Sequence, residues 1–187
     1  MAEHYQHPLN LAVCNLWDYN PPEVAVARVI TTNGYVNSQG RCVMGKGVAD
    51  QCRDKYPGID FILGQGIKEY GNHVQMLPDR IISFPVKQVW WEIARQGLIE
   101  ESAKELIDVC TWAPEYTYVM PFPGIGNGGL RPEDIMSSIE LLIPHVTFCT
   151  VEPLRMMNFL HRDKHPYQLV ALQQGDLNLG GGYVYYV

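Results

Sequence analysis

Short apolar runs alternate with amphipathic stretches along most of the chain. Six runs have the length and composition of strands, and they span residues 9–17, 24–31, 73–77, 80–84, 116–120 and 146–151. Apolar residues recur with helical spacing in four further stretches, at 48–56, 58–70, 96–110 and 132–142. Strands that alternate with helices predict an α/β fold, a layered sheet with some parallel strand pairs.

The pattern weakens after Pro153. A short helix and two strand-like pieces are expected there, at 154–160, 169–172 and 183–187. No internal repeat is visible. We therefore predict one domain over residues 1–152, with a C-terminal extension, 153–187, that packs on it or trails from it.

The bulk properties of the chain exclude one broad class of function. Its 187 residues can bury a self-sufficient core, and 47% hydrophobic with 18% charged residues is ordinary for a globular domain. Fourteen basic against twenty acidic residues give a net charge of −6, so no general positive field exists to hold a nucleic-acid backbone. We expect no general nucleic-acid binding and a monomer, although a short strand can still be recognised locally.

The five cysteines are scattered and predict neither disulfides nor a zinc site. No pair has Cys-x-x-Cys spacing, and no histidine lies close enough to a cysteine to suggest a zinc site. No apolar segment near the N-terminus has the features of a signal peptide, and no apolar run approaches ~18 residues. We expect a cytoplasmic protein with free thiols, no membrane partner, no metal and no cofactor.

Two glycine-rich loops are where chemistry is expected. The first, residues 40–49, leads into a predicted helix, whose N-terminus offers free N–H groups and the positive end of a dipole to a phosphate. The second, residues 123–130, follows a strand and offers up to six backbone N–H groups between Gly124 and Gly129. One such loop alone fits a set of tight turns equally well, whereas two loops favour a diphosphate that is gripped from both sides.

The sequence of the first loop nearly matches the P-loop motif. Gly40, Gly45 and Lys46 stand at matching positions, but Gly47 replaces the Ser or Thr that holds Mg²⁺. Gly40 also lies well beyond the preceding strand. A nucleoside triphosphatase is therefore not expected.

Four ordered motifs resemble the macrodomain family, which binds ADP-ribose. They are Thr32-Asn33-Gly34, Val43-Met44-Gly45-Lys46-Gly47-Val48-Ala49 with Lys55-Tyr56-Pro57, Phe84-Pro85-Val86-Lys87 with Trp90 three residues later, and Pro123-Gly124-Ile125-Gly126-Asn127-Gly128-Gly129-Leu130. The third motif is similar to the branch with DNA-ADP-ribose hydrolase antitoxins and the terminal ADP-ribose protein glycohydrolase. The resemblance runs from about Leu9 to Val151. It implies a three-layer α/β/α sandwich with a mixed, mostly parallel central sheet.

By this resemblance the two loops embrace the diphosphate and distal ribose of ADP-ribose. The implied ligand-binding residues are Asn15, Asn33, Gly45, Lys46, Gly47, Val48, Gly124, Ile125, Gly126, Asn127, Gly128, Gly129 and Leu130. Asn33 would reach the distal ribose hydroxyls, and the alternative is a turn residue before Gly34. Asn15 falls near the position where many macrodomains carry an Asp that contacts the adenine amine, and its carbonyl oxygen can accept from that amine.

Lys87 is the main catalytic candidate, with Asn33 beside it. It follows an apolar strand and a proline, although most lysines are solvated surface residues. In the resembling hydrolases the matching lysine acts at the anomeric carbon of the distal ribose. An ammonium can stabilise a departing group, and an amine of lowered pKa can attack a ring-opened sugar. The protein glycohydrolase has an acidic residue where this chain has Gly128, so the resemblance supports a lysine-centred mechanism and not a lysine–aspartate one.

These residues predict a metal-independent hydrolase that releases ADP-ribose from a modified nucleic acid or protein. Two alternatives stay open. One is a phosphatase acting on ADP-ribose 1″-phosphate, for which the loops offer no histidine or paired carboxylates to activate water. The other is a binding module for ADP-ribose or a related NAD-derived signal. Trp90 and Trp91 could stack on a base or on adenine, or one of them could be a buried core anchor.

Overall fold

A seven-stranded sheet forms the middle layer of the computed structural model, which describes residues 7–172. Its strand order is β3-β4-β2-β5-β6-β1-β7. The strands are β1 (Leu9–Val13), β2 (Ala25–Asn33), β3 (Gln75–Leu77), β4 (Ile81–Lys87), β5 (Tyr116–Pro121), β6 (Val146–Thr150) and β7 (Tyr167–Leu172). Only the β3–β4 pair is antiparallel among these described strands. The predicted mixed, mostly parallel sheet is confirmed.

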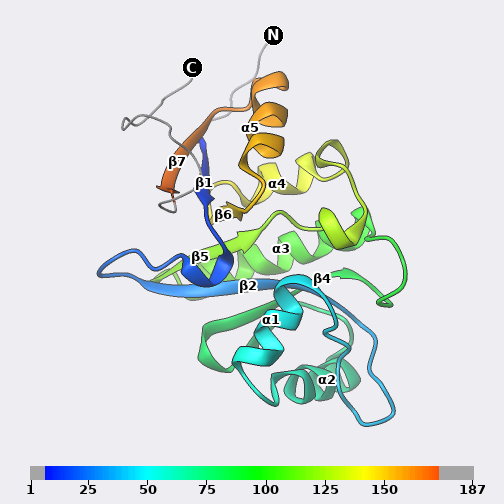
Figure 1. The fold of residues 1–187 in the computed structure, drawn as a ribbon. Helices are drawn as coiled ribbons and strands as arrows, with labels where there is room; N and C mark the ends of the chain where they lie inside the picture. Colours follow the sequence, from blue (N-terminus) through cyan, green and yellow to red (C-terminus); the bar gives the residue numbers. More distant parts are fainter. Residues whose placement is uncertain (1–6, 173–187) are drawn as a thin grey trace.

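Helices cover both faces of this sheet. In the described chain they are α1 (Gly47–Lys55), α2 (Ile59–Tyr70), α3 (Gln96–Trp112), α4 (Met136–Leu142) and α5 (Pro153–Arg162). In Figure 1, α1 and α2 lie together below β2, whereas α3 and α4 lie above it. Successive side chains of a strand point to opposite faces, so Val29 of β2 joins the core under α3 and α4 while Ile30 joins the core under α1 and α2. The predicted three-layer α/β/α arrangement is therefore confirmed.

The first predicted strand is too long by its second half. β1 ends at Val13, and residues Leu16–Asp18 form a 3₁₀ turn. The turn begins at Asn15, whose side-chain oxygen accepts a hydrogen bond from the N–H of Trp17 at 3.1 Å. Asparagine side chains that bond to nearby backbone in this way favour caps over strands. The apolar residues beyond Val13 therefore continue the core without continuing the sheet.

The predicted helix over residues 132–142 is also interrupted. Pro132–Asp134 form a 3₁₀ turn, and α4 begins only at Met136. Asp134 closes the first turn by accepting the N–H of Arg131 at 2.9 Å. Ile135 lies between the two pieces in the αR region, but its φ of −118° and ψ of −1° depart from ideal helical values of about −63° and −42°.

β4 runs through Pro85 to Lys87, which places Lys87 at the carboxyl end of a strand. Proline is tolerated here because the last β3 pairing lies opposite Ser83, so no β3 backbone faces Pro85. The Pro85 carbonyl accepts instead from the Ser102 hydroxyl at 2.8 Å. A register shift at the end of β2 then pairs Asn33 with Lys87. The two predicted catalytic residues are thus neighbours across two parallel strands.

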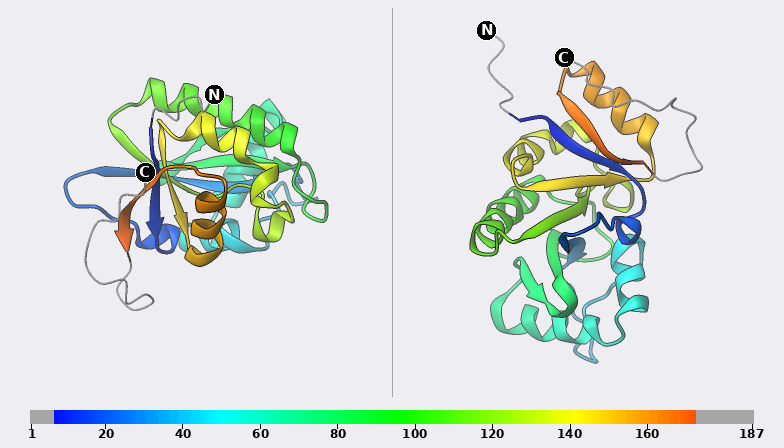
Figure 2. Two further views of the ribbon diagram at one scale, coloured as in Figure 1. Left: turned by 90° about the horizontal axis from the view of Figure 1, so that it is seen from above. Right: turned by 90° about the vertical axis from the view of Figure 1, so that its left-hand side faces the viewer.

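The described part of the C-terminal segment contributes to the same sheet. β7 pairs in parallel with β1, and the two run side by side in Figure 2. Buried side chains of α5 join the core under α3 and α4. The helix expected at 154–160 and the strand at 169–172 are therefore confirmed, whereas the piece expected at 183–187 lies outside the described residues. The division into 1–152 and 153–187 stays a prediction.

Candidate functional site

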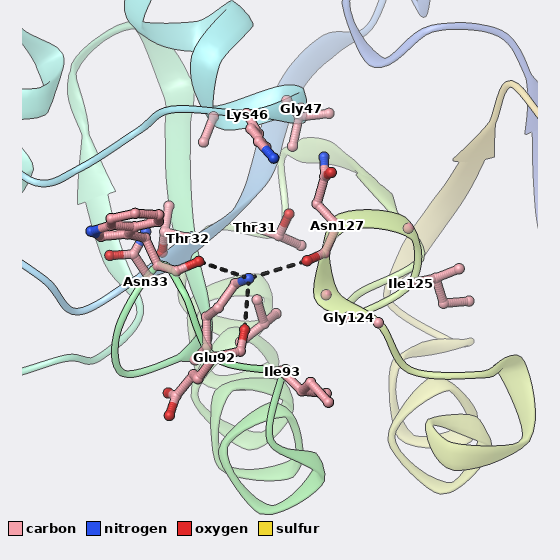
Figure 3. A pocket seen from close by; sticks show the side chains of 18 of the residues that line it. Thr31, Thr32, Asn33, Lys46, Gly47, Glu92, Ile93, Gly124, Ile125 and Asn127 are labelled. Carbon is pink, nitrogen blue, oxygen red and sulfur yellow. Dashed lines mark hydrogen bonds between the residues drawn. The ribbon is translucent and has the colours of Figure 1, made fainter.

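Three neighbouring parallel strands end at one cavity of about 840 Å³, a volume in the range of small-molecule sites. Ligands of open α/β sheets bind beyond the carboxyl ends of the strands, and the residues that end β2, β4 and β5 line this cavity. Further lining residues are Val43, Gly45, Lys46, Gly47, Val48 and Ala49 from the first loop and α1, Trp90, Trp91, Glu92 and Ile93 after β4, and Phe122, Gly124, Ile125, Gly126, Asn127, Gly128 and Gly129 after β5. Both glycine loops therefore face the same space (Figure 3).

Hydrogen bonds hold the first loop in place up to Met44, whereas the backbone N–H groups that follow have no hydrogen-bond partner among the described residues. The N–H of Val43 donates to the Tyr35 carbonyl at 3.0 Å, and the Met44 carbonyl accepts from Arg53 at 2.9 Å. No hydrogen bond among residues 7–172 uses the N–H groups of Gly45–Val48. These four groups include the N-terminus of α1, and donors of this kind can interact with an anion, although their role in binding stays a prediction.

The second loop uses part of its own donors. Gly128 N–H donates to the Ile125 carbonyl at 3.4 Å, and Gly129 N–H donates to the Gly126 carbonyl at 3.0 Å. The expectation of up to six free N–H groups is therefore wrong, because two of them close a 3₁₀ turn. Donors from Gly124 to Asn127 are left to face an anion. The two loops already approach each other, since the side chain of Asn127 lies beside Gly47.

Lys87 reaches the cavity from the end of β4, and its ammonium is held by backbone carbonyls. Nζ donates to the carbonyls of Glu92 and Asn127, both at 3.2 Å, and lies 3.5 Å from that of Trp90 (Figure 3). Two of these carbonyls belong to the loop after β4 and one to the second glycine loop. Lys87 therefore bridges the two sides of the cavity and has a fixed position.

Burial lowers the pKa of Lys87 below the ordinary value of a lysine, and the positive charge of Lys46 lowers it further, while Glu92 opposes both. Lys46 is exposed and lines the cavity, and its side chain points toward the space between the loops. Two cations thus face one cavity. Among the described residues Lys46 takes part in no salt bridge.

Glu92 is a site residue that the sequence analysis missed. Its carbonyl accepts from Lys87, and its carboxylate accepts the N–H groups of Gln88 and Val89. Arg95 binds the same carboxylate at 2.7 Å. Burial raises the pKa of Glu92, but the hydrogen bonds from Arg95 and the two N–H groups outweigh it, and the pKa is lowered. Glu92 therefore stabilises the loop that carries two carbonyl acceptors for Lys87, those of Trp90 and Glu92. No local sequence pattern predicts this role.

Asn33 lines the cavity with a side chain that is already bonded on both ends. Its Nδ2 donates to the Val43 carbonyl at 2.8 Å, and its Oδ1 accepts the N–H of Tyr35 at 2.9 Å. The turn role and a place in the cavity are thus combined in one residue. One Nδ2 hydrogen remains for a ligand.

Two tryptophans, Trp90 and Trp91, line the cavity beyond Lys87, and Tyr35 joins them in one aromatic cluster. The rings of Trp90 and Trp91 meet edge to face at 5.3 Å, and those of Tyr35 and Trp91 meet in the same way at 5.3 Å. Trp90 is 53% exposed and Trp91 is 60% exposed, so neither is the buried core anchor considered from the sequence.

The chain was compared with protein families, curated proteins and solved structures. No model of a protein family matches it. A 103-residue stretch is 29% identical to "DNA ADP-ribosyl glycohydrolase" of Mycobacterium bovis (strain BCG / Pasteur 1173P2), covering 50% of this chain and 29% of that protein. The matched stretch therefore spans less than a third of the curated relative.

Two solved structures show the fold. The macrodomain of Thermus aquaticus DarG superposes with a TM-score of 0.57 at 27% identity over 78% of this chain and 98% of that one. Thermosipho africanus DarTG in complex with ADP-ribose superposes with a TM-score of 0.52 at 17% identity over 68% and 39%. This chain has the macrodomain fold.

Two of the implied ligand residues do not line the described cavity. Asn15 follows β1, which is two strands away from β5 in the sheet, and its side-chain oxygen is taken by Trp17. Leu130 instead packs against Gly124, to whose carbonyl its N–H donates at 3.0 Å. Contacts of Asn15 and Leu130 with a ligand stay predictions.

Gly128 has little room for the acidic side chain found at this position in the protein glycohydrolase. A Cβ built on Gly128 would lie 3.1 Å from the Cβ of Ala94, closer than ordinary van der Waals contact. The N–H of Ala94 also donates to the Gly128 carbonyl at 2.8 Å, which holds the two backbones together. Packing against Ala94 thus accounts for a glycine at the site where a lysine–aspartate pair would need its aspartate.

The cysteines and the potential metal ligands of the described residues form no further site. All five cysteines are free, as expected, and buried, and burial raises the pKa of four of them to about 12. Between residues 7 and 172, no cluster of three or more His, Cys, Asp or Glu side chains could hold a metal ion. Within the same residues no helix combines the length and the apolar character that crossing a membrane requires.

Proposed function

We propose that this macrodomain binds ADP-ribose in the cavity and hydrolyses the bond between ADP-ribose and a modified target, with nucleic acid as the favoured target. One observation carries the proposal. Lys87, at the carboxyl end of β4, holds a partly desolvated ammonium at the cavity between the two glycine loops.

Binding rests on the two sets of backbone donors. The N–H groups of Gly45–Val48 and of Gly124–Asn127 have no backbone partner within the described chain, both loops line one cavity, and the exposed Lys46 adds a positive charge. Preorganised N–H groups and a helix N-terminus match the two negative charges of a diphosphate. Asn33 keeps one donor for a sugar hydroxyl. Diphosphate and distal ribose are therefore assigned to the region between the loops, with the anomeric carbon toward Lys87.

The reaction is a hydrolysis at the anomeric carbon of the distal ribose. The bond from this carbon to the target breaks, and its electron pair moves to the target atom. Water supplies a hydroxyl group to the carbon and a proton to the target. A fixed cation lowers the barrier by stabilising negative charge as it develops on the departing atom, and it does so most strongly where water is scarce.

The contacts of Lys87 favour the ammonium over the free amine. An ammonium donates three hydrogen bonds and has no lone pair, and three backbone carbonyls surround Nζ. A free amine would place its lone pair against at least one carbonyl oxygen. The lowered pKa still leaves an amine accessible at higher pH, so the two mechanisms differ in their pH dependence.

Support for a nucleic-acid target comes from likeness, because the curated relative is named for ADP-ribosyl glycohydrolase activity on DNA. The tight contact of Gly128 with Ala94 disfavours an acidic side chain at this position, which sets this cavity apart from the lysine–aspartate arrangement of the protein glycohydrolase.

A binding module is the second candidate, and the carboxylates favour it. Glu92 is the only carboxylate that lines the cavity among residues 7–172, and Arg95 and two N–H groups already occupy it. No free carboxylate among the described lining residues is therefore placed to activate water as a general base. The same shortage weighs against a phosphatase acting on ADP-ribose 1″-phosphate.

Calorimetric titration with ADP-ribose, followed by a substrate panel, tests the proposal. The panel contains single-stranded DNA and RNA and a protein, each carrying ADP-ribose, together with ADP-ribose 1″-phosphate. We expect binding of ADP-ribose and its release from a nucleic acid. Binding without release from any member would establish the binding module, and no binding would overturn both readings.

A further inference from the structure

We infer that Tyr35, Trp90 and Trp91 form a stacking platform for the nucleobases of the strand that carries the ADP-ribose. This inference rests on the proposed function, since it concerns the group that leaves from Lys87. The platform would decide which targets this cavity accepts, whereas the glycine loops hold the part that all targets share.

The platform lies at the leaving-group end of the cavity. Trp90 contributes one of the carbonyls around Lys87 Nζ. Its ring contacts the ring of Trp91 edge to face, and the Trp91 ring contacts that of Tyr35 in the same way. In the strand order β4-β2-β5, the cavity has Lys87 at one end and Phe122, after β5, at the other. The strands that carry these two residues are separated by two strand spacings of about 4.8 Å each, and the aromatic cluster lies on the side of Lys87.

The exposure of the rings shows that they are available to a flat partner. Tyr35 is 36% exposed, Trp90 53% and Trp91 60%, and the edge-to-face contacts leave ring faces open. A base has a π-face of similar size, and stacking on aromatic side chains is the usual way in which proteins hold single-stranded nucleic acid.

Neutral amides border the platform. Asn72 Nδ2 donates to Gln88 Oε1 at 3.0 Å, and the N–H of Gly34, next to Tyr35, donates to the Gln88 carbonyl at 3.1 Å. The side chain of Asn72 also packs against Gly34. Amide groups of this kind can donate to and accept from base edges.

The charges at this end fit a short strand. Lys46 and Lys87 are cationic, and the nearby carboxylate of Glu92 is paired with Arg95, so a phosphate meets no unpaired negative charge among the lining residues. The net charge of −6 argues against binding along many phosphates of a nucleic-acid backbone. Stacking of a few bases is the mode of contact that remains.

Fluorescence anisotropy with three probes tests this platform: free ADP-ribose, an ADP-ribosylated peptide and an ADP-ribosylated single-stranded oligonucleotide. Titrations use the Lys87→Ala background, so that the modified strand stays intact. Trp91→Ala is the informative change, because the Trp91 side chain is exposed and its backbone carbonyl is not an acceptor for Lys87. Trp91→Phe restores a ring, and Trp112→Ala is the matched control, since Trp112 is 76% exposed at the far end of α3.

Trp91→Ala should weaken binding of the modified oligonucleotide by about 5- to 100-fold and that of the other two probes by no more than about twofold. Trp91→Phe should recover most of the loss, and Trp112→Ala should leave all three affinities unchanged. An equal loss for free ADP-ribose would mean that the ring stacks on ADP-ribose itself. An equal loss for the peptide would mean an unspecific apolar contact. Either result, or no change, overturns the platform.

Failure of the platform and failure of the proposed reaction are distinguishable. A parent protein that releases nothing from the strand, together with a selective loss on Trp91→Ala, would reject the reaction and keep the platform. Release by the parent that Trp91→Ala leaves unchanged at low substrate concentration would reject the platform and keep the reaction.

Discussion

The two glycine loops look alike in sequence but are held in different ways. A Cβ on Gly124 of the second loop would lie 2.7 Å from Cδ1 of Ile99, in the core under α3, and the residue has φ +76°. A Cβ on Gly45 of the first loop would meet nothing within 4 Å, and its φ is not positive. A side chain at position 124 would therefore destabilise the fold, whereas a side chain at position 45 would enter space that no atom of residues 7–172 occupies.

The difference assigns the loops separate tasks. The second loop is tied to the sheet and to Lys87 through the Asn127 carbonyl, so it sets the position of the cation. The first loop ends in four backbone N–H groups without a partner in the described chain and an exposed lysine, so we expect a ligand to accept hydrogen bonds from it. Substitutions that respect this division should separate stability from binding.

The largest effect on stability is expected from Gly124→Ala. Strain at positive φ and the overlap with Ile99 should together cost about 2–5 kcal/mol of the free energy of unfolding. Urea or thermal unfolding measures the loss. Gly45→Ala is the control and should leave the free energy of unfolding within about 0.5 kcal/mol of the parent value. Equal losses for the two variants would contradict the division between the loops.

The largest effect on binding without loss of stability is expected from Gly45→Val. Its side chain would occupy the open space beside the free N–H groups, so affinity for ADP-ribose should fall by about tenfold or more, the equivalent of roughly 1.4 kcal/mol. Calorimetry measures the affinity and thermal unfolding checks the fold. Gly97→Val is matched, because Gly97 on α3 also has open space and a non-positive φ but does not line the cavity. Unchanged affinity in Gly45→Val would remove the first loop from the site.

The pH dependence of turnover should reveal which form of Lys87 acts. Because its pKa is lowered, Lys87 deprotonates at a lower pH than a surface lysine. If the ammonium acts, the single-turnover rate is constant below this pKa and falls about tenfold per pH unit above it. A rate that rises with pH to a plateau, together with trapping of an imine by borohydride, would show attack by the amine instead.

The smallest effect is expected from Lys46→Ala. This side chain is exposed, so its attraction to a diphosphate is screened by water and salt. Affinity for ADP-ribose should fall by about two- to fivefold at low salt and by less at high salt, with no change in the rate of bond cleavage. A loss of cleavage comparable with that of a Lys87 variant would reverse the assignment of the two lysines.

Local patterns predicted most of the fold because the signals that define it are local. Apolar runs located every strand of the described sheet, but the predicted ranges stop before the last residues of β2 and β4 and begin after the first residues of β7, and Gly71 marked the end of α2. The errors arose where a side chain competes with the backbone, as at Asn15, or where a loop consumes its own donors, as at Gly128 and Gly129.

The candidate site was predictable in its loops and not in its core contact. The two glycine-rich loops, each between a strand and a helix, predicted the cavity, and the resemblance to the macrodomain family indicated Lys87. The three carbonyls around its Nζ come from residues 90, 92 and 127, which only the sheet order and the folded loop at Glu92 bring together. Contacts between distant backbone groups leave no trace in residue type, so no reading of the sequence could have found them.

Comparison of Lys87→Ala with Lys46→Ala tests the central claim most directly, with cleavage of an ADP-ribosylated single-stranded oligonucleotide and calorimetric binding of ADP-ribose measured on both. We expect Lys87→Ala to slow single-turnover cleavage by about 100-fold or more while ADP-ribose affinity changes by less than about fivefold. Lys46→Ala should do the reverse, with a small loss of affinity and normal cleavage. Cleavage by Lys87→Ala at the parent rate would contradict the account.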